Sequence, residues 1–402
     1  MKTAAKKNPG TQAPSEEELI ARASALIPML RAQAMEVENA RSVPAQTIDA
    51  FREAGFFKIL QPARWGGWEM HPRTFYKVLM ELGRGCPSSA WNAMILGIHQ
   101  WHFGVMDPRA GDDMWSEDPN ILVGSSYAPL GQIKKVEGGW RLSGTWKTSS
   151  GCDHAAGGSF LGGRVLDGDG NMIDHRAFLV SRKDYEIVDD WHVAGLGGTG
   201  SKSLAVRQAF VPDYRVHSII DYKLTDRPAA YLYPFMQTFG GAVSAAIIGI
   251  AYGMIDLYVE QMKTRQNVFG PAGPAAANPY VKDNLGKAVI QVRSAQARLL
   301  QATQETAAYA MRGEQVPLDK RVLHRLENQY CGRDCLEAAL LLWRKMGTRG
   351  IWLDNLAQLW MRAILVATNH ISQNEDDPAG ILGGYMLGEE VPPLMFNLPE
   401  TP

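Results

Sequence analysis

The spacing of hydrophobic and polar positions divides the chain into a helical part, a β-rich part and a second helical part. In the first part, apolar residues recur near the 3.6-residue period of an α-helix, as at Ile20, Ala23, Leu26, Ile27, Leu30 and Ala34. From about Asn120 to Tyr214, apolar residues alternate with polar ones and glycines cluster, which indicates short strands. The helical period returns from about Ala229 to Gly384. This order predicts a mainly α fold with a central β domain.

The same changes of pattern give the expected domain organisation. We predict a disordered tail over 1–16, an N-terminal helical domain over 17–118, a middle β domain over 119–228 and a C-terminal helical bundle over 229–402. A chain of 402 residues is longer than one hydrophobic core usually serves, so several packed units are expected. Asp167 to Asn171 lies between two apolar runs and predicts a hairpin turn.

Composition and charge exclude some classes of partner. The net charge is −1 and no long block of like charges occurs, which argues against binding to nucleic acid or to an anionic membrane surface. The four cysteines, Cys86, Cys152, Cys331 and Cys335, are few for this length and favour a reducing compartment, so we expect a cytoplasmic protein. Cys331 and Cys335 have helical spacing without a nearby histidine pair, so we expect ordinary thiols and no metal site.

The best candidate for a membrane span is the nearly uncharged run from Phe239 to Val259. Asp256 interrupts the run, Glu260 and Lys263 follow it closely, and no second such run accompanies it. We therefore predict a helix buried between other helices. The N-terminal residues lack the apolar core of a signal peptide, so we expect no membrane association.

Residues 146–154 read Trp-Lys-Thr-Ser-Ser-Gly-Cys-Asp-His and lie between two predicted strands. The indole of Trp146 could cover one face of a flat, polar-edged cofactor such as an isoalloxazine ring. The hydroxyls of Thr148, Ser149 and Ser150 and nearby backbone amides could reach the edge of such a ring. A serine-rich loop next to a packed tryptophan is the alternative interpretation.

A second glycine-rich run, Gly195 to Gly200, matches the G-x-G-x-x-G pattern of dinucleotide-binding folds. That pattern must follow a strand and open a helix whose N-terminus binds the pyrophosphate. Here the following residues, 204–210, have the composition of a strand that ends at Pro212. We therefore predict that this run does not bind a nicotinamide cofactor.

Both runs resemble segments of a known family, the flavin-dependent monooxygenases built on the acyl-CoA dehydrogenase fold. Trp-x-x-x-Ser-Gly-x-Asp-His resembles the flavin-contacting segment of that family, and residues 191–201 resemble its "W…G…GTGS" strand-turn-strand. The resemblance extends from about Glu17 to the C-terminus. It implies an N-terminal helical domain, a β-barrel or sandwich domain and a C-terminal four-helix bundle. For residues 191–201, a structural bend and direct cofactor contact both remain open.

The resemblance also implies residues of the active site. Trp91 matches an aromatic residue near the flavin, His99 matches the histidine of the substrate pocket, and Ser125 matches a pocket serine. His102, one helical turn from His99, and Ser126, next to Ser125, are their rivals. Without the resemblance, a lone histidine on an apolar helix is more often a satisfied core residue.

Two further residues follow from the family motifs. His370 matches a histidine that follows the C-terminal helix motif, where it would act as a general base on a phenol or indole proton. The motif's usual aspartate and tryptophan are replaced here by Ala363 and Met361. Arg265 matches an arginine that reaches the flavin phosphate of a neighbouring subunit, although a surface arginine at a helix end is the alternative.

The implied activity is that of an oxygenase component. Reduced flavin, FMN or FAD, would come from a separate NAD(P)H:flavin reductase and react with O₂ to a C4a-hydroperoxyflavin. Ser150 would bond the N5 edge of the ring. The product would be a hydroxylated small aromatic, phenolic or indolic, and the chain would be a homotetramer.

Three alternatives remain open at this point: an acyl-CoA dehydrogenase-type oxidoreductase, an N- or S-oxygenase on the same fold, and a non-catalytic oligomer that binds an aromatic ligand. A dehydrogenase needs a carboxylate base, which many members place at the end of the segment that here carries His370. The first carboxylate after His370 is Glu375, which favours the oxygenase.

Overall fold

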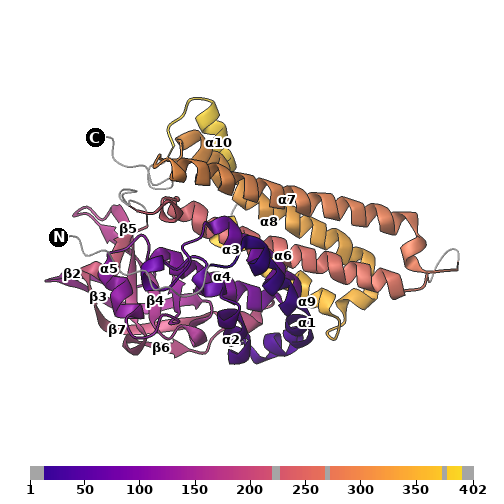
Figure 1. Cartoon of the computed structure of the whole chain (residues 1–402), viewed down its shortest axis with the longest axis horizontal. Helices are drawn as coiled ribbons and strands as arrows, with labels where there is room; N and C mark the ends of the chain where they lie inside the picture. Colours follow the sequence, from indigo (N-terminus) through magenta and orange to yellow (C-terminus); the bar gives the residue numbers. More distant parts are fainter. Residues whose placement is uncertain (1–12, 220–226, 268–271, 374–377, 392–402) are drawn as a thin grey trace.

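The computed structural model describes residues 13–219, 227–267, 272–373 and 378–391. The long helices α6 (Phe235–Thr264), α7 (Pro279–Met311) and α8 (Leu318–Met346) pack side by side along the longest axis (Figure 1). The shorter α9 (Leu356–Ala367) packs on α6 and α8 and completes a four-helix bundle, and α10 (Pro378–Met386) contacts α8. The strands gather at one end, beside the N-terminal helices.

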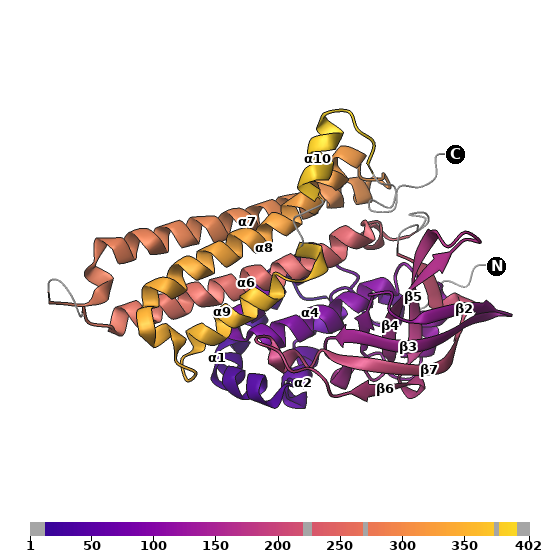
Figure 2. The same cartoon turned by 180° about the vertical axis from the view of Figure 1, so that it is seen from behind.

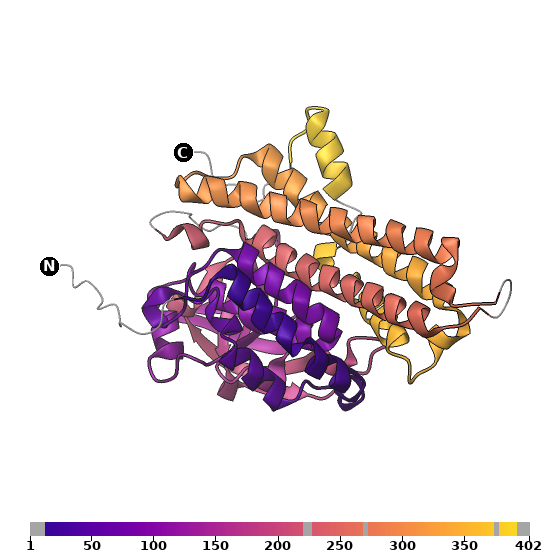
Figure 3. The same ribbon diagram turned by 45° about the vertical axis from the view of Figure 1, so that its right-hand side comes forward.

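Five helices make up the N-terminal part: α1 (Glu16–Ala40), α2 (Ala45–Glu53), α3 (Pro72–Gly85), α4 (Pro87–His102) and α5 (Pro108–Trp115). Ser15 caps α1, because its hydroxyl accepts from the Glu18 N–H while the Glu18 carboxylate accepts from the Ser15 N–H. The helix therefore begins one residue before the predicted start of the N-terminal helical domain at 17. Residues 1–12 lie outside the described residues. Figure 3 shows these helices, in indigo, in front of the strands.

The strands form two four-stranded sheets. One has the order β1-β4-β5-β8 and the other the order β2-β3-β7-β6. Their bounds are β1 Val123–Ser126, β2 Gln132–Val136, β3 Gly139–Ser149, β4 Gly158–Leu166, β5 Met172–Ser181, β6 Tyr185–Val188, β7 Lys202–Pro212 and β8 Val216–Ser218. β4 and β5 pair antiparallel across residues 167–171, which confirms the predicted hairpin. β7 confirms that a strand, and no helix, follows the glycine-rich run.

The predicted buried helix is confirmed by α6. Its most apolar stretch is 78% buried inside the protein, although its length and composition would also allow a membrane span. Close packing against α3 depends on glycine, because a Cβ on Gly249 would lie 2.5 Å from the carbonyl oxygen of Met80. A Cβ on Gly83 would meet the backbone of Gly249 in the same way, at 2.7 Å. The two glycines therefore let the N-terminal helices lie directly on the bundle.

Candidate active site

Helix α4 carries two of the predicted site residues and lies between the strands and α6 (Figure 2). Trp91 and His99 are eight residues apart, which is about 12 Å along a helix axis. Both side chains are buried, Trp91 at 5% and His99 at 0% exposed. Each is therefore held in place by the packing of α4, and they mark two ends of one candidate site.

The strand β3 brings the serine-rich run to α4 through a bulge. Trp146 pairs with Leu204 and Ser149 with Lys202, so β3 holds one residue more than β7 between these pairs. An extra residue shifts the alternation of side chains by one. Thr148 lies inside the bulge at φ 62°, a left-handed conformation that is strained for a β-branched residue. As a result, Ser150, directly after the strand, faces α4, whereas Trp146 faces the sandwich core.

Ser150 joins a chain of hydrogen bonds that we call the hydroxyl chain. Trp91 Nε1 donates to Ser150 Oγ at 3.1 Å, and Ser150 Oγ lies 2.7 Å from Ser201 Oγ. Ser201 Oγ lies 2.7 Å from Thr199 Oγ1, which donates to the carbonyl of Leu196 at 2.7 Å. Because the Thr199 proton goes to a carbonyl, Ser201 must donate to Thr199 and Ser150 to Ser201. Ser150 Oγ therefore keeps a lone pair for a further donor.

Three other predicted cofactor residues, Trp146, Ser149 and Thr148, are not members of the hydroxyl chain. Trp146 is fully buried in the sandwich core, where its Nε1 donates to the carbonyl of Gly162, so the prediction that its indole covers a cofactor ring is wrong. The Ser149 hydroxyl is also fully buried and has no partner among the described residues, and a Cβ on Gly124 would lie 3.5 Å from it, so it lies beside β1. Thr148 is exposed, and its contact with a cofactor stays a prediction.

His370 reaches the same place from the C-terminal part. Its ring lies 5.8 Å from the ring of Trp91 in an edge-on arrangement. α9 ends at Ala367, so His370 lies in the turn that follows the helix and not on it. The Thr368 hydroxyl donates back to the carbonyl of Ile364 and competes with further helical turns. Trp91, Ser150 and His370 thus converge from three distant segments.

The hydrogen bonds of His370 indicate which of its ring nitrogens carries the proton, and its role as a base stays a prediction. Its Nδ1 accepts the Ser372 N–H at 3.2 Å and lies 2.9 Å from Ser372 Oγ. Burial lowers the pKa of His370 to about 4, so the ring is neutral at physiological pH. A neutral ring that accepts at Nδ1 carries its proton on Nε2. In this arrangement Nε2 can donate a hydrogen bond to a ligand.

The other end of the site is a cluster of rings around His99. The His99 ring lies 5.5 Å from Phe160 and 5.5 Å from Phe239, and its Nδ1 lies 3.3 Å from the hydroxyl of Tyr127. Its Nε2 is buried and has no partner among the described residues. Burial lowers the pKa of His99 to about 3. A buried, unpartnered ring nitrogen is costly unless a ligand satisfies it.

The structure distinguishes Ser126 from Ser125 and His102 from His99. Ser126 donates to the carbonyl of Lys147 at 2.6 Å, so its hydroxyl is used within the β domain. The Ser125 hydroxyl bonds no other side chain or carbonyl among the described residues and the residue is 6% exposed, so it is the serine left for a ligand. His102 is fully buried, and its Nδ1 lies 3.1 Å from the Tyr127 hydroxyl, which also bonds His99. His102 is therefore a partner of His99 through Tyr127 and does not replace His99 in the pocket.

Helix α6 connects the two ends. Phe239 contacts the ring of His99, and the next residue, Gly240, faces the segment of His370, since a Cβ on Gly240 would lie 3.9 Å from the Cβ of Ser372. α4 connects the ends from the other side. The predicted residues Trp91, Ser150, His370, His99 and Ser125 are therefore grouped around the contact between α4, α6 and the β domain.

The turn over residues 191–201 is held on both sides by the helical part. The Gly198 N–H donates to Glu38 Oε2 at 3.1 Å, and Arg362 Nη1 donates to the carbonyl of Ala194 at 2.6 Å. Arg362 also lies 3.6 Å from Glu38 as an ion pair. These contacts favour the interpretation of a structural bend, which reaches the site only through Thr199 and Ser201. Glu38 and Arg362 supply polar contacts in a segment where Ala363 replaces the expected aspartate.

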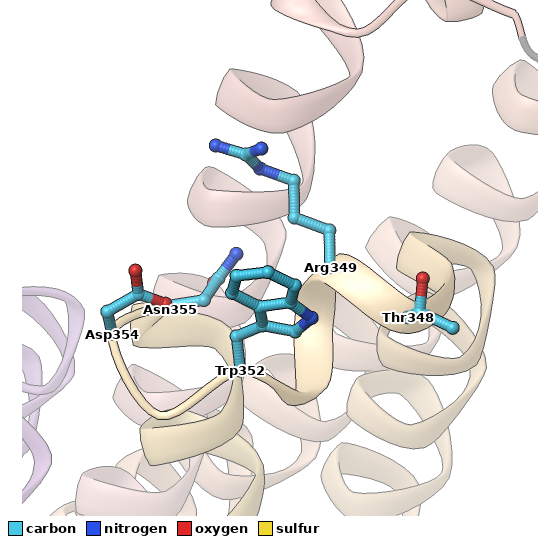
Figure 4. Close-up of a pocket in the computed structure, with 5 residues that line it drawn as sticks. All are labelled: Thr348, Arg349, Trp352, Asp354 and Asn355. Atoms are coloured by element: carbon cyan, nitrogen blue, oxygen red, sulfur yellow. The ribbon is translucent and has the colours of Figure 1, made fainter.

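Arg265 does not lie with the other predicted residues. It follows the far end of α6, and its Nη1 donates to the carbonyl of Met346 at the end of α8, at 3.0 Å. Within one chain it therefore caps a helix, and contact with a neighbouring subunit's flavin stays a prediction. Shortly after Met346 in the sequence, the turn between α8 and α9 has a surface hollow (Figure 4). It is lined by Thr348, Arg349, Trp352, Asp354 and Asn355.

Sequence reasoning missed several residues of the site. Ser201 and Tyr127 bond predicted residues directly, and Phe239 and His217 complete the ring cluster. Tyr127 could have been found, because it follows Ser125 by two positions and so shares its side of the chain. No local signal marks Phe239 or His217, which come from segments more than 100 residues from His99.

Comparison with known proteins identifies the family and the fold of the chain. Residues 16–105 match the acyl-CoA dehydrogenase N-terminal domain and residues 242–375 the acyl-CoA dehydrogenase C-terminal domain. The flavin-dependent monooxygenase oxygenase subunit HsaA of Rhodococcus jostii is 36% identical over 76% of this chain and 81% of its own length. The oxygenase component of p-hydroxyphenylacetate 3-hydroxylase of Acinetobacter baumannii is 28% identical over 92% of this chain and 89% of its own. The crystal structure of the HsaA monooxygenase from M. tuberculosis, 30% identical, superposes with a TM-score of 0.88 over 94% of this chain and 99% of that one.

Proposed function

The chain belongs to the flavin-dependent monooxygenases of the acyl-CoA dehydrogenase fold, the oxygenase components of two-component aromatic hydroxylases, and from this premise we propose how its site is used. Trp91, Ser150 and His370 hold the reduced flavin, and His99 and Ser125 hold the aromatic substrate. The observation that carries the proposal is the convergence of Trp91, Ser150 and His370 from three segments.

The donors and acceptors at this end fit a reduced flavin. Ser150 Oγ keeps a lone pair, which suits the N–H at position 5 of a reduced ring, and the His370 Nε2–H suits a ring acceptor. When bound, the reduced flavin supplies the electrons with which O₂ is activated. Among the described residues, no carboxylate bonds Trp91, Ser150 or His370, and Glu375 lies outside them.

The rings around His99 fit a small aromatic substrate. Phe239, Phe160 and Tyr127 surround the imidazole with apolar surface, and His99 Nε2 and Ser125 Oγ are polar atoms without a protein partner among the described residues. A mostly apolar pocket with a few placed polar groups is typical of sites for small ligands. The substrate is a phenolic or indolic compound, in line with the p-hydroxyphenylacetate named for one relative.

The test supplies the purified chain with a separate NAD(P)H:flavin reductase, FMN or FAD, and candidate phenols under isotopically labelled oxygen gas. We expect one labelled oxygen atom in the product, and the better flavin identifies the cofactor. The control omits the reductase, in which case no NADH should be consumed. NADH oxidation by the chain alone would contradict the need for a partner.

Two other outcomes would favour the alternative functions. Reduction of bound oxidised flavin by an acyl-CoA would support the dehydrogenase, and oxygen transfer only to nitrogen or sulfur would support an N- or S-oxygenase.

We also propose a homotetramer in the cytoplasm. The turn between α8 and α9 exposes Ile351, Trp352 and Leu353 at 55%, 65% and 78%, an apolar surface that a second copy would cover. Arg265 lies at this end of the bundle, where it could reach a neighbouring subunit. Light scattering should give four times the chain mass, and Trp352→Glu should lower it. A wild-type monomer that binds reduced flavin tightly would disprove the shared site.

A further inference from the structure

His99 is the first member of a second chain of hydrogen bonds, which we call the imidazole chain. The Tyr127 hydroxyl lies 3.3 Å from His99 Nδ1 and 3.1 Å from His102 Nδ1. His102 Nε2 is the hydrogen-bond partner of His217 Nε2, and His217 Nδ1 lies 2.5 Å from the carbonyl oxygen of Ser218. The members come from α4, from the residue after β1, and from β8.

The carbonyl at the end of this chain fixes the direction of its protons. The Ser218 oxygen can only accept, so His217 Nδ1 carries a proton and, in a neutral ring, His217 Nε2 does not. His102 Nε2 must then donate to His217, which leaves His102 Nδ1 as an acceptor. The Tyr127 hydroxyl donates its single proton to this nitrogen, its nearer partner, and accepts from His99 Nδ1. The neutral His99 is left with an unprotonated Nε2.

We propose that Tyr127, His102 and His217 are positioning residues that hold His99 in the Nδ1–H tautomer, so that its free Nε2 accepts a hydrogen bond from the substrate. This assignment explains why His99 Nε2 is buried without a protein partner. It deepens the proposed function, on which it rests for the identity of the ligand. The group that lies against His99 is a hydrogen-bond donor, such as a phenolic O–H or indolic N–H, and not an ether or a carbonyl.

Burial keeps the three imidazoles neutral, as the argument requires. It lowers the pKa of His217 to about 4 and of His99 to about 3, and it lowers that of His102 well below the usual range. Asp174, whose charge acts on His217 against those of Arg227 and Arg176, is itself bonded by Ser218 Oγ at 2.6 Å and Arg176 Nε at 2.5 Å. A proton on His217 Nε2 would reverse every bond of the chain and place the His99 proton on Nε2, which is the opposite prediction.

The direct test is nitrogen NMR of the ligand-free protein labelled at its nine histidines. The His99 signals are assigned by their loss in His99→Gln. We expect a protonated Nδ1 and an unprotonated Nε2 in the wild type, and a shift towards the Nε2–H form in Tyr127→Phe, because the Nδ1–H loses its acceptor. Tyr231→Phe is the matched control, since it removes another buried hydroxyl that bonds the carbonyl of Leu60 and is no member of the chain.

A second variant and a second measurement distinguish loss of the chain of hydrogen bonds from misfolding of the Tyr127→Phe protein. His217→Leu removes the far end of the chain and should shift the tautomer in the same direction by a smaller amount. Phenol should bind the flavin-loaded protein about tenfold more tightly than anisole, which lacks the proton to donate, and Tyr127→Phe should reduce this ratio to about threefold or less. Tyr231→Phe should keep the ratio.

The outcomes separate this inference from the proposed function. A wild-type His99 protonated at Nε2, or a tautomer and binding ratio unchanged in Tyr127→Phe, would overturn the inference even if the enzyme hydroxylates phenols. Conversely, the expected tautomers in a protein that transfers no oxygen to any aromatic would leave the positioning residues in place and contradict the proposed function instead.

Discussion

Each end of the candidate active site holds a chain of hydrogen bonds that ends at a backbone carbonyl, but the two chains are built from different groups. The hydroxyl chain runs from Trp91 through Ser150 to the carbonyl of Leu196, and the imidazole chain runs from His99 through Tyr127 to the carbonyl of Ser218. In both, a backbone carbonyl sets the direction of the protons. The difference lies in how easily that direction can change.

A hydroxyl reverses its hydrogen bond by a rotation, whereas a neutral imidazole must exchange one tautomer for the other. The hydroxyl chain can therefore adapt when the group next to Ser150 gains or loses a proton, as a flavin does between its redox states. The imidazole chain resists such change. We infer that the flavin end tolerates several states of one ligand, while the substrate end selects one kind of ligand.

Removing the acceptor at the imidazole end should have the largest effect. His99→Ala should slow product formation by about 10²–10⁴-fold, because the substrate proton loses its acceptor, while reduced flavin still reacts with O₂. Product and hydrogen peroxide are measured together, and peroxide should rise as product falls. His324→Ala is the control, since His324 is also buried but bonds Glu305 in the helical bundle. Equal losses in both variants would mean that His99 is merely structural.

At the hydroxyl end the expected effect is smaller. Ser150→Ala should lower the yield of product per reduced flavin about fivefold to tenfold, since one hydrogen bond of about 1 kcal/mol or slightly more is lost at the ring edge. Substrate affinity should hardly change. Ser149→Ala is the matched control, because the neighbouring hydroxyl is buried and bonds no member of the hydroxyl chain. A larger loss for Ser149→Ala would exchange the two assignments.

Acid should destabilise the imidazole end through His99 and His217, and at the flavin end it should act through His370 and not through the hydroxyl chain. The folded pKa values of His217 and His370 are about 4 and that of His99 about 3, against about 6.5 in an unfolded chain. Between pH 6.5 and 4 the unfolded chain therefore binds more protons, so the free energy of unfolding falls as the pH falls. Melting temperatures should drop across this range, and less steeply in His217→Leu than in Ser201→Ala. Identical slopes in the two variants would show that His217 does not titrate as inferred.

The smallest effect should come from the middle of the hydroxyl chain. Ser201→Ala frees the Ser150 proton but leaves the Trp91 bond, so the yield of product should fall only about twofold or threefold. Peroxide release under the conditions used for Ser150→Ala provides the measurement. If Ser201→Ala were as damaging as Ser150→Ala, direct contact of Ser150 with the flavin would no longer be needed to explain either result.

The local patterns predicted the fold well, because helical and strand periods are properties of neighbouring residues. The hairpin at residues 167–171 and the strand after the glycine-rich run follow from short stretches of sequence, and the structure has both. The motif positions also named residues that the structure brings together, since Trp91, Ser150 and His370 converge. Trp146 shows the limit, because the bulge at Thr148 reverses which side chains face the helices.

The sequence by itself determined the period of each segment, the glycines that allow close packing and the presence of the flavin-family motifs. Only the tertiary structure decided the protonation pattern of the site. In our inference, the tautomer of His99 depends on Tyr127 and His217, which come from other segments of the chain. A tautomer is set by the last acceptor of a hydrogen-bond chain, and folding alone brings that acceptor to the imidazole.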